Sequence, residues 1–310
     1  GWIFKITWEA DSILGKFGIY SVSIFFILSG LSMAIVYNRY IVNIQSSVFF
    51  IVRRIFRIWP LLWICIVLVI VPFILKNGIT GISEPWKIFI NMTTLFGFID
   101  PSNYINAGAW SIGNEMVYYA LTPLIIIIFN KKKIFGNIFA LFTFIVSLVF
   151  AFHIMDNSKS LSDQWTLYIN PFNNFSLYVI GIAIYYNFRK IRLNNYVFWS
   201  LGIISILIFT LYPISGDQIN LVTKFNRVVF ILASIILVLF FYKIPVEIES
   251  KIPKFLKYIF EKFGIATYGI YLLHPVVLLY WRNMLERINI SNQYITFFGC
   301  VVLTIVGALI

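Results

Sequence analysis

The sequence is poor in charged residues. Only 12% of its 310 residues are Asp, Glu, Lys or Arg, whereas a soluble domain carries about 25%. Hydrophobic residues make up 60% of the chain, and the mean hydropathy is +0.89. A water-soluble fold of this length cannot bury that much apolar surface. The composition therefore excludes a soluble protein and indicates a chain that folds in a lipid bilayer.

The residues used for metal and disulfide chemistry are also scarce. The two cysteines, Cys65 and Cys300, lie in apolar stretches and have no metal-ligand spacing. The two histidines are His153, expected at a membrane boundary, and His274. The sequence contains no phosphate-binding glycine loop, nucleophile elbow or zinc-type motif. We therefore expect no metal site and no bound cofactor.

The apolar residues form continuous runs of about 20 residues, the length of a membrane-spanning helix. Strands of an outer-membrane barrel would instead alternate apolar and polar residues. The predicted fold class is therefore all-α, a polytopic transmembrane helical bundle that forms a single domain over residues 1–310. Nine spans are expected, at residues 17–37, 58–75, 110–129, 134–152, 170–187, 196–213, 226–243, 262–281 and 294–310.

The net charge of +12 follows the pattern of a membrane topology. Basic residues lie between the apolar runs, which argues against nucleic-acid binding. With nine spans, 15 of the 24 Lys and Arg residues fall on one side, which we expect to be cytoplasmic, with Gly1 outside. The 15 are Arg39, Arg53, Arg54, Arg57, Lys131, Lys132, Lys133, Arg189, Lys190, Arg192, Lys243, Lys251, Lys254, Lys257 and Lys262.

Glu115 is a carboxylate inside the predicted span 110–129. A charged side chain in hydrocarbon costs at least about 2.5–3.5 kcal/mol, so such a residue is a candidate for function. An alternative is an interfacial glutamate that reaches water or caps a helix. Because Glu115 belongs to a polar stripe, we favour the functional interpretation. Helical spacing defines that stripe as Ser111, Glu115, Tyr118 and Tyr119.

His274 lies past the middle of the predicted span 262–281 and precedes Pro275. Proline has no backbone N–H, so the carbonyl of Tyr271 loses its helical hydrogen bond. A histidine there can titrate near neutral pH or hold a partner through its second nitrogen. It can equally be a structural histidine bonded to a neighbouring helix.

Three arginines, Arg53, Arg54 and Arg57, precede Trp59 and Pro60. On a helix they share one face, and three guanidinium groups suit a multiply phosphorylated ligand. The positive-inside rule also requires basic residues at this place, and they could bind anionic lipid headgroups.

Four segments, taken in order, resemble the membrane acyltransferase 3 family. Each motif is loose by itself, but the ordered set extends over most of the chain. Ile112, Tyr118 and Thr267 depart from the family pattern conservatively. The segments are FFILSG at 25–30, RRIFRIWP at 53–60, WSIGNE at 110–115 with Tyr118, Tyr119 and Pro123, and YGIYLLHP at 268–275.

The resemblance implies a ten-span enzyme of a bacterial cell membrane. Such enzymes move an acyl group, often acetyl, from acyl-CoA on the cytoplasmic side to a hydroxyl of an envelope or secreted polysaccharide on the other side. By this resemblance Glu115 and His274 would be catalytic. The remaining matched residues would bind substrate: Arg53, Arg54 and Arg57 the CoA phosphates, and Trp110, Ser111, Tyr118 and Tyr119 the acceptor sugar.

The first span of the family would lie before Gly1, and Ile310 lies inside an apolar run, so the chain is expected to be truncated at both ends. That span carries the arginine and the catalytic histidine of the family, and this fragment alone is expected to be inactive. The rival hypothesis is a transporter or flippase of a lipid-linked glycan. Transporters often contain two related halves, and we find no such internal similarity.

Overall fold

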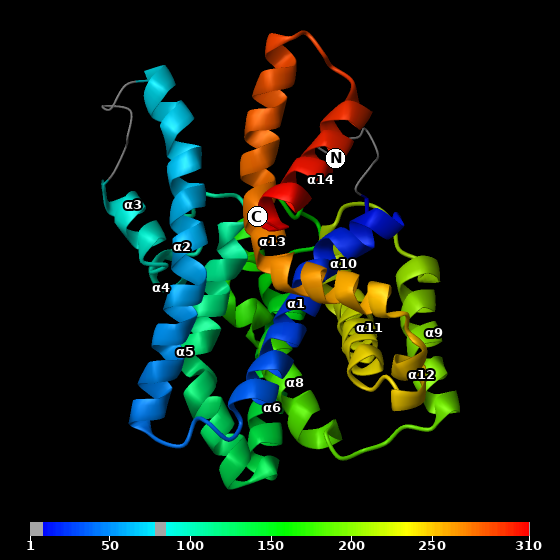
Figure 1. Ribbon diagram of the computed structural model, residues 1–310. Helices are drawn as coiled ribbons and strands as arrows, with labels where there is room; N and C mark the ends of the chain where they lie inside the picture. The colour runs from blue at the N-terminus through cyan, green and yellow to red at the C-terminus, as the bar shows by residue number, and fades with distance from the viewer. Residues whose placement is uncertain (1–8, 78–84, 310) are drawn as a thin grey trace. The chain divides into compact units, whose positions relative to one another are not determined.

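The computed structural model describes residues 9–77 and 85–309. Every regular element in these ranges is a helix, which confirms the predicted all-α class (Figure 1). The elements are α1 (Ile13–Tyr37), α2 (Ile44–Asn77), α3 (Pro85–Met92), α4 (Phe96–Ile99), α5 (Ala109–Lys131), α6 (Lys133–Val149), the π-helical turn η2 (Phe150–Ile154), α7 (Trp165–Tyr168), α8 (Pro171–Phe188), α9 (Asn195–Leu211), α10 (Ile219–Val222), α11 (Lys224–Tyr242), α12 (Val246–Lys251), α13 (Lys254–Arg287) and α14 (Gln293–Leu309).

Among the described residues, six helical stretches are long and apolar enough to cross a membrane. Three other predicted spans fall on α8, α9 and α14, which have 17 or 18 residues. Each predicted span therefore lies on a helix, and the total of nine spans stays a prediction. The six stretches are Ile13–Tyr37, Ile44–Pro72, Ala109–Lys131, Lys133–Ile154, Lys224–Tyr242 and Lys254–Arg287.

The chain divides into two compact units. Of the described residues, unit 1 contains 53–77, 85–113 and 251–309, and unit 2 contains 9–52 and 114–250. Helices α2 and α5 contribute residues to both units.

The core of unit 2 is built on the close approach of α1 and α8. A Cβ atom at Gly30 would overlap the carbonyl oxygen of Tyr178, and one at Gly181 would overlap the carbonyl oxygen of Ile27. Glycine at both positions therefore lets the two backbones touch, as small residues do in membrane helix pairs.

Tyr118 fixes α5 within the core of unit 2. Its ring lies 5.3 Å from the rings of both Phe26 and Tyr178, measured between centroids. Its hydroxyl donates a hydrogen bond of 2.8 Å to the carbonyl of Pro171. The segment of α5 that carries Glu115 and Tyr119 is thereby held against α1 and α8.

Unit 1 contains the long helix α13, which pairs with α14 and contacts α2. The hydroxyls of Tyr268 and Tyr280 donate to the carbonyls of Ile58 and Leu68 on α2, at 2.7 and 2.8 Å. The indole of Trp281 donates to the carbonyl of Ile295 on α14 at 3.2 Å. These bonds fix the part of α13 on which His274 lies.

Candidate functional site

Glu115 lies inside unit 2 and is only 3% exposed. Its Oε1 atom accepts hydrogen bonds from the hydroxyls of Ser29 on α1 and Tyr119 on α5. The Ser29 and Tyr119 oxygens lie 3.2 Å apart, as expected for two donors that meet at one acceptor. Because the side chain is buried among other side chains, the structure argues against an interfacial glutamate that reaches water.

The four residues of the predicted polar stripe contact three different residues in the structure. Glu115 and Tyr119 face Ser29 of α1, whereas Tyr118 donates to the backbone of Pro171. Ser111, which belongs to unit 1, is buried and donates to the hydroxyl of Tyr271 at 2.7 Å. The stripe is thus a set of packing contacts as well as a candidate site.

His274 is exposed and is held by its own helix. Its Nδ1 atom lies 2.6 Å from the carbonyl oxygen of Tyr271, the group that Pro275 deprives of its helical partner. A carbonyl can only accept, so Nδ1 carries the hydrogen, and the neutral ring has its lone pair on Nε2. Within the described part of the chain, Nε2 has no hydrogen-bond partner. The imidazole is therefore not bonded to a neighbouring helix, and it presents a basic nitrogen.

A pocket of about 600 Å³ lies beside His274 in unit 1. Its size is within the range of small-molecule binding sites, roughly 300–1,000 Å³. The wall is mainly apolar, and Trp110 supplies an aromatic surface. The lining residues are Ala107, Gly108, Trp110, Tyr271, His274, Pro275, Leu278, Leu279, Arg282, Asn283 and Glu286.

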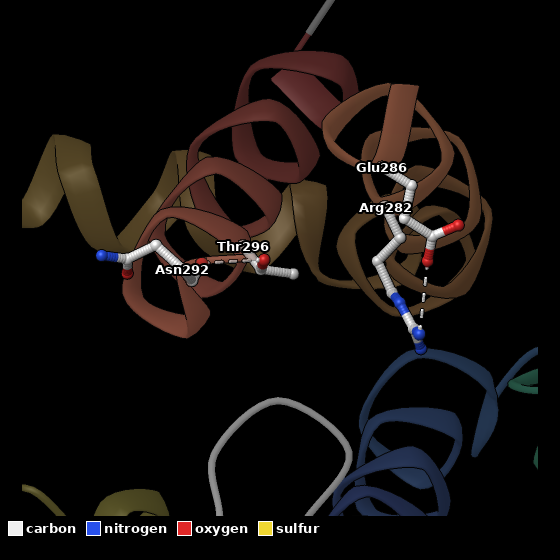
Figure 2. Close-up of polar contacts among 4 residues, drawn as sticks. All are labelled: Arg282, Glu286, Asn292 and Thr296. Atoms are coloured by element: carbon white, nitrogen blue, oxygen red, sulfur yellow. Dashed lines mark hydrogen bonds and ion pairs between the residues drawn. The ribbon is translucent and has the colours of Figure 1, made fainter. Parts of the chain in front are cut away.

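Two of the residues that line this pocket form an ion pair. Arg282 Nη2 and Glu286 Oε1 are 3.7 Å apart, one turn from each other on α13 (Figure 2). Both residues also line a second pocket of about 440 Å³, whose far wall includes Thr296 at the start of α14. An exposed pair of this kind contributes about 0–1 kcal/mol, so a ligand can separate the two side chains at low cost.

The three arginines of α2 have different surroundings in unit 1. Arg54 is buried, whereas Arg53 and Arg57 are exposed. Two guanidinium groups therefore reach the surface on this part of α2, and the third points inward. Two exposed guanidinium groups one turn apart still fit a phosphorylated ligand.

Arg227, which the sequence analysis did not single out, is a buried cation of unit 2. It is 3% exposed, and its Nη2 atom donates to Ser147 Oγ at 3.0 Å and to the carbonyl of Asn173 at 2.7 Å. No carboxylate of the described residues lies within ion-pair distance of it. Burial raises the pKa of the neighbouring Tyr168 to about 12, so this phenol stays neutral and does not balance the charge.

One signal in the sequence could have identified a residue that was missed. Arg227 lies inside the predicted span 226–243, so the rule that selected Glu115 applies to it equally. The sequence contains no such signal for Ser29, which lies in the FFILSG segment. Its bond to Glu115 joins positions 86 residues apart, which no local pattern indicates.

The cysteines are buried and free in the structure. The thiol of Cys65 lies 3.6 Å from the carbonyl of Leu272, and that of Cys300 lies 3.9 Å from the carbonyl of His274. In residues 9–77 and 85–309, no group of three or more His, Cys, Asp or Glu side chains could hold a metal ion.

Comparison with known proteins identifies the family. The sequence profile of acyltransferase 3, described as "Acyltransferase domain", matches residues 2–310, and the chain belongs to this family. It is also similar to Nodulation protein 10 of Rhizobium leguminosarum bv. viciae, with 23% identity over 219 residues. The aligned region covers 62% of this chain and 55% of that protein, so the chain spans about half the length of this relative. No solved structure matches the chain.

Proposed function

We propose that this membrane protein transfers an acyl group, in the first instance acetyl, from acyl-CoA to a hydroxyl of a cell-surface or exported polysaccharide. Membership of the acyltransferase 3 family supports the reaction class. The observation that carries the proposal is His274, whose Nε2 atom lacks a partner in the described chain and whose ring lines a pocket of about 600 Å³. This is the arrangement that a general base requires.

The proposed step begins with the acceptor hydroxyl in the pocket beside His274. Its oxygen attacks the carbonyl carbon of the thioester while Nε2 takes the hydroxyl proton. The C–S bond then breaks, and the CoA sulfur leaves with the proton that Nε2 received. The bond from Nδ1 to the Tyr271 carbonyl keeps the ring in the basic tautomer before each turnover.

The proposal gives the other predicted residues supporting roles. Trp110 offers an aromatic face to the acceptor sugar in the pocket. Arg53 and Arg57, which are exposed, would bind CoA phosphates through charge-assisted hydrogen bonds. Glu115, with Ser29 and Tyr119, would orient or balance the histidine of the family's first span, which is the alternative base to His274.

The test is acyl transfer in membranes that contain the protein with its native flanking sequence. Labelled acetyl-CoA is the donor, and label in surface glycan is the readout. We expect His274→Ala to lower the transfer rate about 10²–10⁴-fold, because the proton acceptor is removed. His153→Ala is the matched control, since its ring is exposed on η2, and it should keep the parent rate. A His274→Ala rate within twofold of the parent would place the base elsewhere and refute the role proposed for His274.

Glu115→Gln tests the buried carboxylate in the same assay. Its amide oxygen can still accept from Ser29 and Tyr119, so the fold should persist while the negative charge is lost. We expect transfer to be abolished with donor binding retained. Replacement of both Arg53 and Arg57 by Gln should instead weaken donor binding. Movement of unmodified glycan lipid across the bilayer without labelling would instead support the flippase.

A further inference from the structure

Helix α13 is too long for a single membrane crossing. Its 34 residues would extend about 50 Å, whereas the hydrocarbon core is about 30 Å thick. Figure 1 shows that α13 bends, so its first turns run in a different direction from the remainder. The first buried residue of the helix is Ala266. Residues 254–265, the initial segment, therefore extend outside the packed part of unit 1.

The initial segment is amphipathic. At about 100° per residue, five of its large apolar side chains fall within an arc of about 140°, and Ile265, at the end of the segment, lies outside this arc. This face is uncovered in the structure, with Phe255 71% and Phe260 66% exposed. The residues of the apolar face are Phe255, Leu256, Ile259, Phe260 and Phe263.

The opposite face of the initial segment is basic. Lys254 and Lys257 lie on it, Lys262 lies at its border with the apolar face, and Glu261 is its only acidic residue. The Lys262 ammonium group lies 5.4 Å over the ring of Tyr258, which belongs to the same face. Aromatic and aliphatic residues opposite lysines, on a helix that joins a membrane span, are typical of interfacial helices.

We infer that the initial segment lies in the headgroup layer of the membrane, with its apolar face in the acyl chains and its lysines on anionic headgroups. Its charge argues for this occupant, because three lysines attract the acidic lipids of the leaflet on which basic residues collect. A second copy of the chain would bring like-charged lysine edges together. The bend supports the same conclusion, since a segment in line with the rest of α13 would leave the bilayer.

Depth measurements on the protein in lipid nanodiscs test this inference. In a Cys65→Ala, Cys300→Ala background, a spin label is placed at Leu256 or Ile259 on the apolar face, or at Lys257 or Glu261 on the basic face. We expect oxygen to collide preferentially with labels on the apolar face, and a water-soluble nickel chelate with those on the basic face. Equal exposure to the chelate on both faces would overturn the inference. Dipolar broadening confined to the apolar positions would do the same, because it would identify a second copy as the occupant.

Lipid charge tests the role of the lysines. Addition of phosphatidylglycerol to phosphatidylcholine nanodiscs should move the label at Ile259 deeper in the parent protein, and should not do so when Lys254, Lys257 and Lys262 are all changed to Gln. The matched control changes Lys131, Lys132 and Lys133 to Gln, which removes the same charge and should leave the response intact. An unchanged response in the first triple variant would refute the lysine contacts. Protection of the basic face by free CoA, without any effect of lipid charge, would assign the lysines to a soluble phosphate and refute the lipid assignment.

Discussion

At the scale of single residues, the covalent structure of a residue was a better basis for prediction than its position along the chain. The free carbonyl of Tyr271 follows directly from Pro275, and the structure shows that the ring of His274 occupies it. The absence of a partner for Nε2 among the described residues could not be predicted, because it depends on the groups that surround the ring after folding. The cost of a charge in hydrocarbon identified Glu115, but nothing in the sequence identified Ser29, which donates a hydrogen bond to it.

Arg227 leads to a prediction about stability. Its planar guanidinium donates from two nitrogens, Nη2 to Ser147 and Asn173 and Nη1 to the carbonyl of Val222, and the single nitrogen of a lysine cannot reproduce this geometry. We expect Arg227→Lys to lower the free energy of unfolding by about 1–3 kcal/mol, because a buried acceptor loses its donor. The measurement is unfolding in mixed detergent micelles. Arg282→Lys, at an exposed position, is the control and should change stability by less than about 0.5 kcal/mol.

At the scale of elements, the contact between α1 and α8 leads to a second stability prediction. Gly30→Ala or Gly181→Ala places a methyl group against a backbone carbonyl, which cannot rotate away. We expect each change to cost about 1–3 kcal/mol, the range for overpacked cores. Gly307→Ala on α14 is the control, since the nearest atom to its Cβ is 3.9 Å away. Stability is measured as the concentration of denaturing detergent at the midpoint of unfolding. Equal midpoints for all three variants would show that α1 and α8 can separate freely.

Element boundaries were harder to predict than element positions. All nine predicted spans fall on helices, because a long apolar run has no other stable structure in lipid. However, α2 begins at Ile44 and contains Pro60 in its interior, and α13 extends beyond 262–281 at both ends. The apolar runs mark the residues that suit hydrocarbon, whereas a helix continues as long as its backbone hydrogen bonds do. Short helices such as α4 and α10 have no apolar run of their own.

At the scale of the whole molecule, the distribution of positive charge leads to a prediction about topology. Lys132 lies between α6 and the preceding α5, whereas Ser158 follows η2, at the opposite end of α6. We expect a cysteine at Ser158 to react with a membrane-impermeant thiol reagent in intact cells. A cysteine at Lys132 should react only after the membrane is opened. Labelling of both, or of Lys132→Cys alone, in intact cells would contradict the assignment of the basic side as cytoplasmic.

The class of the molecule was predictable from composition, and its family from four short motifs, which the match over residues 2–310 confirms. The pairing of distant elements was not predictable. Nothing in the apolar runs themselves shows that α1 packs on α8, because all membrane helices have similar surfaces and lipid does not force a particular pair together. The candidate site could not be predicted for a similar reason, since its polar groups come from segments far apart in the chain.

The hydrogen bonds of Arg227 also bear on how the protein is made. All three of its acceptors, Ser147, Asn173 and the carbonyl of Val222, precede it in the chain. When the ribosome delivers α11, the helices α6 and α8 have already been synthesised, so the cation can meet its acceptors as it enters the bilayer. The order of synthesis thus provides the polar environment before the charge arrives. A rearranged gene that placed α11 ahead of α6 would expose the same arginine to lipid with no acceptor in place.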